Sequence, residues 1–276
     1  VLALAPPAAA AEAERASRIL SVGGAVTEIV YALGEQDRLA ARDATSTWPP
    51  EAEALPDVGY MRALSAEGVL SVAPDLIVAE EGAGPPETVE LLQAAAIPFV
   101  TVPDATDAAG VLARIRAVGD AIGVPGKAAA LAEEVGAELD AALAAAGAAQ
   151  GAPKRVLFVL STEGGRIMAS GTGTAADGII GMAGGVNAVS DFEGYKQMTD
   201  EAVAAAAPDV ILMMDRSGSG GDHDSSDAEL FAMPAIATTP AAEAGAVVRM
   251  DGLTLLGFGP RTAEAVTALS EALHGG

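Results

Sequence analysis

The 276-residue chain contains no cysteine and only two histidines. It therefore has no disulfides, no thiolate metal ligands and no cysteine nucleophile. His223 lies in a Gly/Ser-rich acidic stretch, and His274 stands near the end of the sequence. Neither has the neighbours of a catalytic triad or of a metal-ligand pair. We expect His223 to be a solvated loop residue and His274 to be exposed.

Basic residues and long apolar runs are also scarce. Fifteen Lys and Arg stand against 38 Asp and Glu, which gives a formal net charge of −23. This charge repels phosphate backbones and argues against a nucleic-acid ligand, and any anionic ligand would need local positive charge. No stretch reaches the ~18 uninterrupted apolar residues of a membrane span. At ~100 to 200 residues per domain, the chain is long enough for two hydrophobic cores.

The N-terminal residues differ in composition from the rest. Residues 1–13 (VLALAPPAAAAEA) lack an initiator Met and resemble the end of an apolar segment followed by small residues suited to cleavage. This pattern is typical of a secretory signal. The alternative is a disordered Ala/Pro tail. We therefore interpret residues 1–17 as a signal-peptide remnant or disordered tail and exclude them from the fold.

One segment of the sequence occurs twice. Residues 64–79 (LSAEGVLSVAPDLIVA) align in register with residues 198–213 (MTDEAVAAAAPDVILM). Each copy offers a Ser or Thr N-cap, a Glu that favours the positive end of a helix, a short helix, a Pro-Asp break and an apolar strand. Tandem arrays need at least ~3 copies of ~20 to 50 residues. Two distant copies instead predict two similar lobes with a ligand cleft between them.

Elsewhere, helices alternate with short apolar strands, which is typical of parallel α/β sheets. Such sheets bind ligands beyond the carboxyl ends of their strands. The Ala-rich amphipathic helix at residues 127–146 would be ~30 Å long at ~1.5 Å per residue and would limit lobe movement. We predict an α/β fold with two Rossmann-like lobes joined by this long rigid helix. The N-terminal lobe spans residues 18–124, the interlobe helix 125–150 and the C-terminal lobe 151–276, which ends in a helix at 261–273.

A glycine-rich loop raises a second possibility. Residues 171–176 (GTGTAA) match a dinucleotide-type GxGxxA loop, and Asp191 follows. The fingerprint belongs at the start of a Rossmann unit, with its acid at the end of the second strand. Asp191 instead lies in a Gly/Asn/Ser-rich loop. We favour a tight turn in which Thr174 caps a helix over residues 175–182, and a nucleotide-dependent α/β enzyme is the alternative.

A tyrosine followed by a cation precedes each copy of the repeat. Residues 59–62 (GYMR) precede the first copy, and residues 194–196 (GYK) precede the second, one residue out of register. Either tyrosine alone is more often a packing residue with a hydrogen-bonded hydroxyl. A phenolate, however, is a hard anionic ligand for Fe(III), and a nearby guanidinium lowers its pKa from ~10. The pattern therefore favours capture of ferric iron or ferric haem.

Four segments together resemble the periplasmic haem-binding proteins of bacterial haem ABC importers. They are residues 21–34 (SVGGAVTEIVYALG), 45–50 (TSTWPP), 58–67 (VGYMRALSAE) and 255–261 (LLGFGPR). The likeness covers nearly the whole chain after the tail, and the GYMR segment is its most discriminating part. Related siderophore and cobalamin binders share the fold but not usually that segment.

The resemblance implies roles for residues that face the haem. Tyr60 falls at the position of the family's axial phenolate ligand, and Arg62 at that of an Arg that supports the phenolate or a propionate. Arg216 resembles the C-lobe Arg that faces the haem, and Tyr195 lies in a segment similar to the second-lobe cleft loop. Some relatives use a C-lobe His as a second iron ligand, and no His occurs here in a comparable segment. We expect one haem, with its porphyrin also covered by Met61, Met168 and Phe192.

The resemblance also implies the partner and the location. Glu67 and Glu201 correspond to exposed acids that dock onto Arg pockets of the permease dimer. The structural alternative is that both acids only complement the dipoles of their helices, an interaction worth ~0.3 to 1 kcal/mol each. We therefore predict a monomeric periplasmic protein that binds ferric haem, delivers it to an inner-membrane ABC importer and catalyses no reaction. A siderophore or cobalamin binder of the same fold is the closest alternative.

Overall fold

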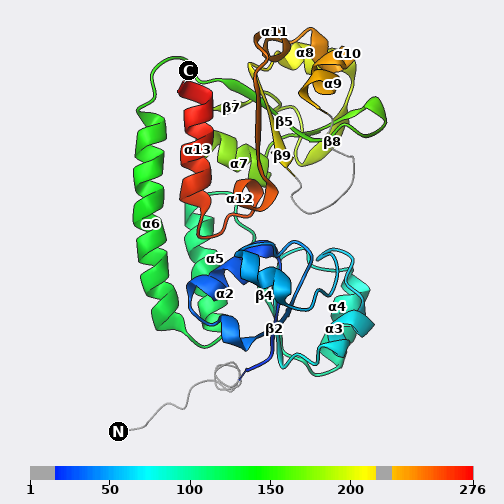
Figure 1. Cartoon of the computed structure of the whole chain (residues 1–276), viewed down its shortest axis with the longest axis vertical. Helices are drawn as coiled ribbons and strands as arrows, with labels where there is room; N and C mark the ends of the chain where they lie inside the picture. Colours follow the sequence, from blue (N-terminus) through cyan, green and yellow to red (C-terminus); the bar gives the residue numbers. More distant parts are fainter. Residues whose placement is uncertain (1–15, 216–225, 276) are drawn as a thin grey trace. The chain divides into compact units, whose positions relative to one another are not determined.

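The structure, a computed structural model, describes residues 16–215 and 226–275. The chain divides into unit 1, which ends at Ala137, and unit 2, which begins at Glu138. The boundary falls within the long helix α6 (Pro125–Gly147) (Figure 1). Each unit contains its own sheet and helices, which confirms the predicted α/β fold with two lobes and a long helix. The predicted cleft between the lobes stays a prediction, and all but two residues of the predicted tail lie outside the described residues.

Unit 1 contains a four-stranded sheet in which all neighbouring strands are parallel. Its strands, in the spatial order β2-β1-β3-β4, are β1 (Ile19–Val22), β2 (Leu39–Arg42), β3 (Leu76–Glu80) and β4 (Phe99–Val102). Every residue of β1 is buried, as is typical of parallel strands covered on both faces. The helices of this unit before α6 are α2 (Gly24–Ala32), α3 (Ala66–Ser71), α4 (Pro86–Ala94) and α5 (Ala108–Ala121), with 3₁₀ turns η1 (Gln36–Arg38) and η2 (Pro50–Ala54).

Unit 2 contains a mixed sheet, which corrects the expectation of purely parallel strands. Its strands are β5 (Arg155–Ser161), β6 (Ile167–Ser170), β7 (Val186–Asn187), β8 (Tyr195–Met198), β9 (Val210–Asp215) and β10 (Val247–Asp251). The path runs β10-β9-β5-β6-β8, with β7 also paired to β5, and β6 is antiparallel to both β5 and β8. Only the short turn η3 (Glu163–Gly165) joins β5 to β6. A parallel crossover needs a dozen or more residues, so this turn forces an antiparallel neighbour.

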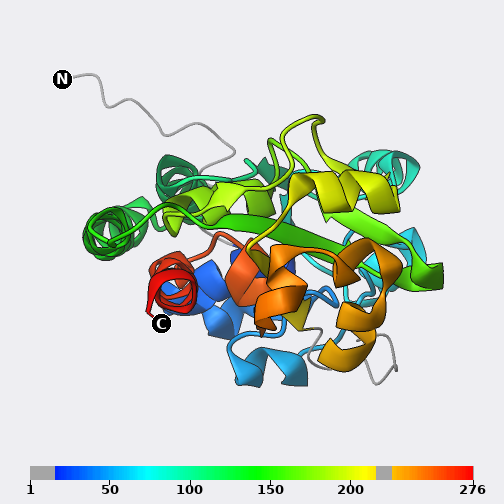
Figure 2. The same ribbon diagram turned by 90° about the horizontal axis from the view of Figure 1, so that it is seen from above.

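The helices of unit 2 form two groups. Helices α8 to α11 contribute to one apolar core with alternate residues of β5 and β9, among them Leu157, Val159, Ile211 and Met213. Helices α7, α12 and α13 pack against one another. The C-terminal half of α6 runs beside α13 (Figures 1 and 2), and both line a shallow pocket. The helices after α6 are α7 (Ala175–Met182), α8 (Asp200–Ala206), α9 (Asp227–Ala232), α10 (Pro234–Ala237), α11 (Pro240–Ala244), α12 (Gly252–Leu256) and α13 (Thr262–His274).

Helices α6 and α13 follow the predicted sequence patterns closely. Helix α6 buries small apolar residues at intervals of three and four, namely Ala128, Ala132, Val135, Leu139, Ala142 and Ala146. This spacing is the apolar stripe of an amphipathic helix. Helix α13 begins and ends within one residue of its predicted bounds. No helix in the described parts of the chain has the length and hydropathy needed to cross a membrane.

The two copies of the repeat fold alike. The Ser65 hydroxyl accepts a hydrogen bond from the backbone N–H of Gly68, and the Thr199 hydroxyl accepts one from that of Ala202, so each caps its helix as predicted. After each helix, an alanine with positive φ precedes the Pro-Asp pair (Ala73, 44°; Ala207, 43°). β3 and β9 follow as buried strands.

The structure adds an arginine to the repeat that the alignment did not include. Arg18 donates from Nε to Ala73 O at 2.9 Å and through its backbone N–H to Asp75 Oδ1 at 2.9 Å. Arg155 likewise donates from Nε to Ala206 O at 3.1 Å and through its backbone N–H to Asp209 Oδ2 at 2.8 Å. In each unit, an Arg at the start of the first strand therefore binds the end of the repeat helix. The Asp of the Pro-Asp pair accepts from the same strand.

We expect Asp75→Ala and Asp209→Ala each to lower the free energy of unfolding by about 1 to 2 kcal/mol. The Asp75 carboxylate accepts from the backbone N–H groups of Ser17 and Arg18, and that of Asp209 accepts from the N–H of Arg155. Asn at either position should recover part of the loss, since its amide oxygen still accepts. Urea unfolding at pH 7 measures both effects. Unchanged urea midpoints in both Ala variants would show that these bonds do not stabilise the units.

Candidate ligand site at the carboxyl edge of the first sheet

Tyr60 lies in the loop between β2 and α3, beyond the carboxyl end of β2. Ligands of parallel α/β sheets bind at this edge. The Tyr60 side chain is 49% exposed, which is unusual for a large aromatic ring. The phenol is therefore open to a ligand, and the role of Tyr60 as an iron ligand stays a prediction.

Backbone hydrogen bonds fix the residues on both sides of Tyr60. Gly59 O accepts from the N–H of Ala44, in the loop after β2, at 2.9 Å, and Met61 O accepts from that of Gly84, in the loop after β3, at 2.9 Å. Gly59 has φ +95°, a conformation that side chains disfavour. The tyrosine is therefore displayed from a backbone held by two neighbouring loops.

Met61 is a core residue, which corrects its assignment to the haem surface. It is 7% exposed and belongs to the apolar cluster that includes Leu20, Val58, Leu64 and Val69. Its side chain anchors the loop to this apolar cluster, whereas its neighbours Tyr60 and Arg62 are exposed. Within the described residues, Arg62 makes no hydrogen bond or ion pair, so its guanidinium is available to an anionic group.

In unit 2, Tyr195 is the first residue of β8. The prediction that it lies in a loop is therefore wrong. Tyr195 pairs with Ser170 of β6, is 39% exposed and packs edge-to-face on Phe158 with ring centroids 6.4 Å apart. The next residue, Lys196, places Nζ 5.1 Å from the centre of the Phe192 ring. Strand pairing thus fixes the backbone of this Tyr-Lys pair more tightly than a loop would.

The other predicted haem contacts have mixed outcomes. Met168 on β6 is half-buried, and half-buried Phe192 packs against the apolar core of unit 2. Their contact with a ligand stays a prediction. Arg216 and His223 lie outside the described residues. His274 is half-buried and not exposed as expected, because the end of α13 packs close to Gly184.

The glycine-rich loop is a tight turn, as favoured above. Thr174 caps α7 by accepting from the Asp177 N–H at 3.0 Å. The N–H groups of residues 171–173 all donate within the protein, and that of Gly173 donates to the Asp177 carboxylate at 3.0 Å. A pyrophosphate would need these donors and would meet a negative charge. The geometry therefore disfavours the nucleotide-enzyme alternative.

A buried polar cluster that the sequence analysis missed lies at the same edge as the Tyr60 loop. Asp43 follows β2, and its Oδ1 accepts from the Gly23 N–H at 2.9 Å. Glu80 ends β3, and its Oε1 accepts from the Ala25 N–H at 3.2 Å. Two carboxylates thus meet the N-terminal end of α2, where the helix dipole favours negative charge. The signal in the sequence was an acid at the end of each strand.

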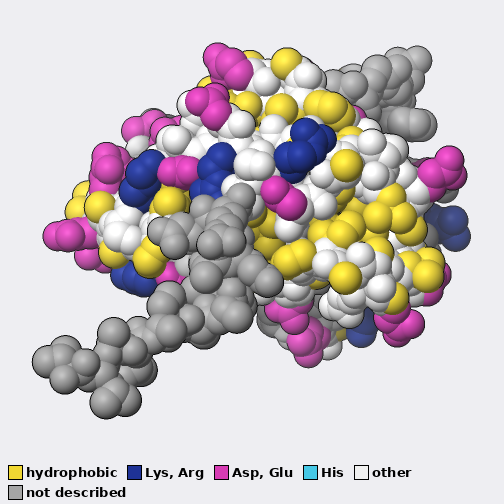
Figure 3. Space-filling view, turned by 90° about the horizontal axis from the view of Figure 1, so that it is seen from below, with side chains coloured by type: hydrophobic (Ala, Val, Ile, Leu, Met, Phe, Trp, Pro, Cys, Tyr) yellow, Lys and Arg dark blue, Asp and Glu magenta, His cyan; other side chains and the backbone are white. Residues whose placement is uncertain are grey.

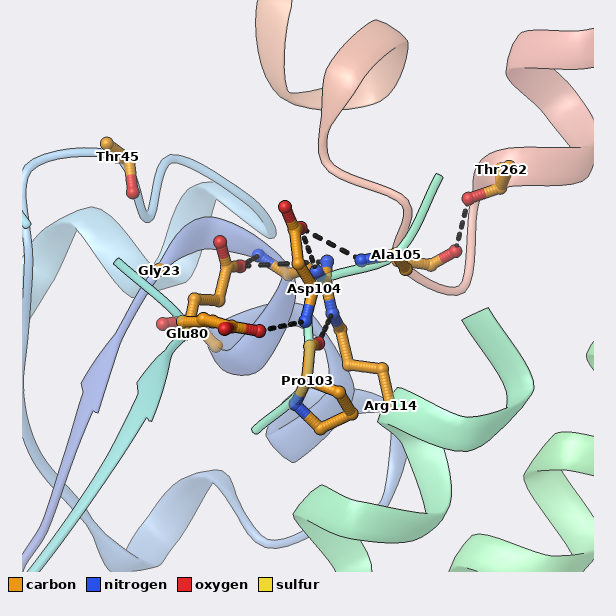
Figure 4. A network of polar contacts seen from close by, with 12 residues as sticks. Gly23, Thr45, Glu80, Pro103, Asp104, Ala105, Arg114 and Thr262 are labelled. Atoms are coloured by element: carbon orange, nitrogen blue, oxygen red, sulfur yellow. Dashed lines mark hydrogen bonds and ion pairs between the residues drawn. The ribbon is translucent and has the colours of Figure 1, made fainter. Parts of the chain in front are cut away.

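Arg114 of α5 is the cation of this cluster (Figure 4). It is 1% exposed. Its Nε donates to Pro103 O at 3.0 Å, its Nη2 pairs with Asp104 Oδ1 at 2.8 Å, and its Nη1 lies 4.0 Å from Glu80 Oε1. Burial raises the pKa of Glu80 to about 7; the charge of Arg114 opposes this rise and the Asp43 carboxylate adds to it. Glu80 therefore titrates near neutral pH.

The two predicted docking acids occupy equivalent places. Glu67 and Glu201 are exposed in the first turns of α3 and α8. The N–H of Glu201 and the hydroxyl of Thr199 hold the pKa of Glu201 below its usual range. Acidic side chains also lie around much of the rim of the face shown in Figure 3.

Comparison with known sequences identifies relatives of this chain. The family model for periplasmic binding proteins matches residues 19–253. YvrC of Bacillus subtilis, an uncharacterised ABC transporter substrate-binding lipoprotein, is 30% identical over 200 residues, which is 72% of this chain and 63% of YvrC. This chain thus matches less than two thirds of the length of YvrC. A vitamin B12-binding protein of Pectobacterium atrosepticum is 30% identical over 201 residues, 71% of each chain.

Solved structures are similar over nearly the whole fold. The periplasmic heme-binding protein BhuT, in complex with two hemes, has a TM-score of 0.87 and 42% identity over 93% of this chain and 98% of its own. The periplasmic heme-binding protein RhuT from Roseiflexus sp. RS-1, in apo form, has a TM-score of 0.88 and 38% identity over 94% and 98%. The fold, the repeat and these matches agree, and the chain belongs to the periplasmic binding protein family.

Proposed function

We propose that this protein binds ferric haem through Tyr60 and delivers it to an ABC importer of the inner membrane. The observation that carries the proposal is the exposed phenol of Tyr60, held on an anchored loop at the sheet edge beside the exposed Arg62. The similarity to periplasmic heme-binding proteins at 38% and 42% identity supports the choice of haem.

The chemistry follows from the two side chains. A phenolate oxygen supplies a hard anionic ligand to the ferric iron, and a guanidinium stabilises the phenolate or pairs with a propionate. We further assign Arg216 and Tyr195 to the opposite side of the haem, and Met168 and Phe192 to apolar contacts with the porphyrin. In this proposal the protein acts in the periplasm as a monomeric carrier and not as an enzyme.

A cobalamin carrier is the second candidate, because the vitamin B12-binding protein of Pectobacterium atrosepticum is 30% identical to this chain. A siderophore carrier of the same fold belongs to the same class. An exposed Tyr beside an exposed Arg favours ferric haem, since it offers an iron ligand and a carboxylate partner together.

Titration of the purified protein with hemin, followed by absorbance, tests the proposal. We expect a saturable haem spectrum, whereas cyanocobalamin and a ferric hydroxamate siderophore should not compete. The equivalence point also measures the predicted ratio of one haem per protein. Saturable binding of either competitor, with no specific uptake of hemin, would replace haem by that ligand.

Charge reversal at Glu67 and Glu201 together should abolish haem delivery to the cognate permease reconstituted in vesicles. Both carboxylates are exposed on the two repeat helices, so lysines there would repel basic pockets of the partner. Hemin titrations should stay unchanged, and delivery by the parent protein should weaken as salt rises.

A matched control reverses one exposed acid in each unit away from those helices, Glu133→Lys with Glu243→Lys. This control should deliver haem like the parent. Equal loss of delivery in the control would show that the effect comes from the change in net charge and not from docking by Glu67 and Glu201. Loss of hemin binding in the Glu67/Glu201 variant would show that those acids bind the ligand.

A further inference from the structure

We propose that Arg42 and Asp57 are positioning residues that hold the Tyr60 loop in its ligand-binding shape. Neither residue belongs to the predicted site, and neither was singled out from the sequence. The consequence for haem rests on the proposed function, whereas the consequence for the loop itself does not.

Arg42, the last residue of β2, is 9% exposed and joins three segments of the loop. Its Nε donates to Ala52 O in η2 at 3.1 Å. Its Nη1 donates to Asp43 O at 3.0 Å and pairs with Asp57 Oδ2 at 3.2 Å. These charge-assisted hydrogen bonds hold the three acceptors at one point, the end of the strand.

Asp57 carries this link to the residue before the tyrosine. While its Oδ2 pairs with Arg42, its Oδ1 accepts from the Gly59 N–H at 2.8 Å. Gly59 has φ +95° and lies directly before Tyr60. The carboxylate therefore connects the buried end of β2 to the turn that orients the exposed phenol.

Hydrogen bonds between main-chain groups hold the first part of the loop, and the Asp57 side chain holds the turn at Gly59. The Arg42 N–H donates to Pro56 O at 2.9 Å, and the Val58 N–H donates to Arg42 O at 3.0 Å. These bonds hold residues 56–58 beside β2 and do not involve the Asp57 side chain. Removing that side chain should therefore loosen residues 59–62 without unfolding the loop.

A loop that is ordered before the ligand arrives loses less conformational entropy on binding. Groups that orient a metal ligand typically change metal affinity by ~10- to 100-fold when they are removed. We expect Asp57→Ala to accelerate haem dissociation by that factor. Asp57→Asn should recover part of the loss, because its amide oxygen still accepts from Gly59 although the ion pair with Arg42 is gone.

The first measurement uses the apoprotein and needs no ligand. Amide hydrogen exchange at residues 59–62 should be faster in Asp57→Ala than in the parent and intermediate in Asp57→Asn. Asp75→Ala is the matched control, because it removes a backbone-binding carboxylate of the same unit at the opposite end of the sheet. The control should leave exchange at 59–62 unchanged. Parental exchange in Asp57→Ala, or equal acceleration in Asp75→Ala, would overturn the positioning role.

The second measurement is haem transfer from each holoprotein to excess apomyoglobin. Dissociation should accelerate in Asp57→Ala and not in Asp75→Ala. If Asp57→Ala shows faster amide exchange but loses haem at the rate of the parent, the link to haem retention is refuted. The role of Asp57 in holding the loop would still be supported. A parent that binds no hemin would instead refute the proposed function, and the exchange experiment would still decide whether Asp57 holds the loop.

Discussion

The Tyr60→Phe protein should lose its affinity for ferric haem by on the order of 100-fold or more, because the change removes the proposed iron ligand and keeps the ring. The folded state should be unaffected. The ring is 49% exposed, and the hydroxyl has no hydrogen-bond partner among the described residues. Hemin titration and the ferric absorption spectrum measure the first expectation, and urea unfolding measures the second.

The chain offers a matched control in Tyr31→Phe, which makes the same chemical change on α2 at a half-buried tyrosine. This variant should bind hemin like the parent. Arg62→Ala should act less severely than Tyr60→Phe, because it removes the neighbouring positive charge and keeps the proposed iron ligand. A Tyr60→Phe protein with the parental spectrum and affinity would remove Tyr60 from the iron.

The second large effect is a dependence of stability on pH through Glu80. Burial raises the pKa of Glu80 to about 7, although the charge of Arg114 opposes this rise. Between pH ~4.5 and 7 the folded protein keeps this proton while the unfolded chain releases it. Protonated Glu80 therefore contributes its full stability below the pKa of the unfolded chain, ~4.5. This contribution is lost as pH rises through the pKa of the folded protein, about 7. From pH 5 to pH 8 this loss should amount to about 2 to 3 kcal/mol.

Other acids titrate as well, so the measurement is a difference between two proteins. Urea unfolding of Glu80→Gln and the parent at pH 5 and pH 8 should show the variant gaining stability relative to the parent as pH rises. Glu81→Gln changes the neighbouring exposed carboxylate and should show no such gain. A difference between Glu80→Gln and the parent that is constant with pH would contradict the raised pKa.

Much of the fold could be predicted because it depends on chemistry within a few residues. The caps at Ser65, Thr199 and Thr174 each bind an N–H group three residues later, so the residue type and spacing in the sequence suffice. Helix α6 follows from an apolar stripe that any amphipathic helix shows. The repeat predicted two lobes for the same reason, since each copy specifies its own local structure.

The structural surroundings of the candidate site residues were predicted only in part, and the misses share a cause. Tyr60 and Met61 are neighbours in a loop without periodicity, and the sequence does not tell which one faces the core. The direction is decided by the apolar core of unit 1, in which Met61 is buried together with Leu20, Val58 and Leu64. Tyr195 became a strand residue because β8 pairs with β6, and the residues next to Tyr195 in the sequence do not specify that pairing.

The sequence by itself determined the two repeat helices with the strands that follow them, the helices α6, α7 and α13, the two lobes and a Tyr-Arg pair as the candidate site. Only the tertiary structure brought Asp43, Glu80 and Arg114 together, because Asp43 follows β2, Glu80 ends β3 and Arg114 lies on α5. It also joined Arg42 to Asp57. A pKa near 7 and a tethered loop arise from burial and from contacts between distant segments, whereas the sequence pattern records only the preferences of each segment.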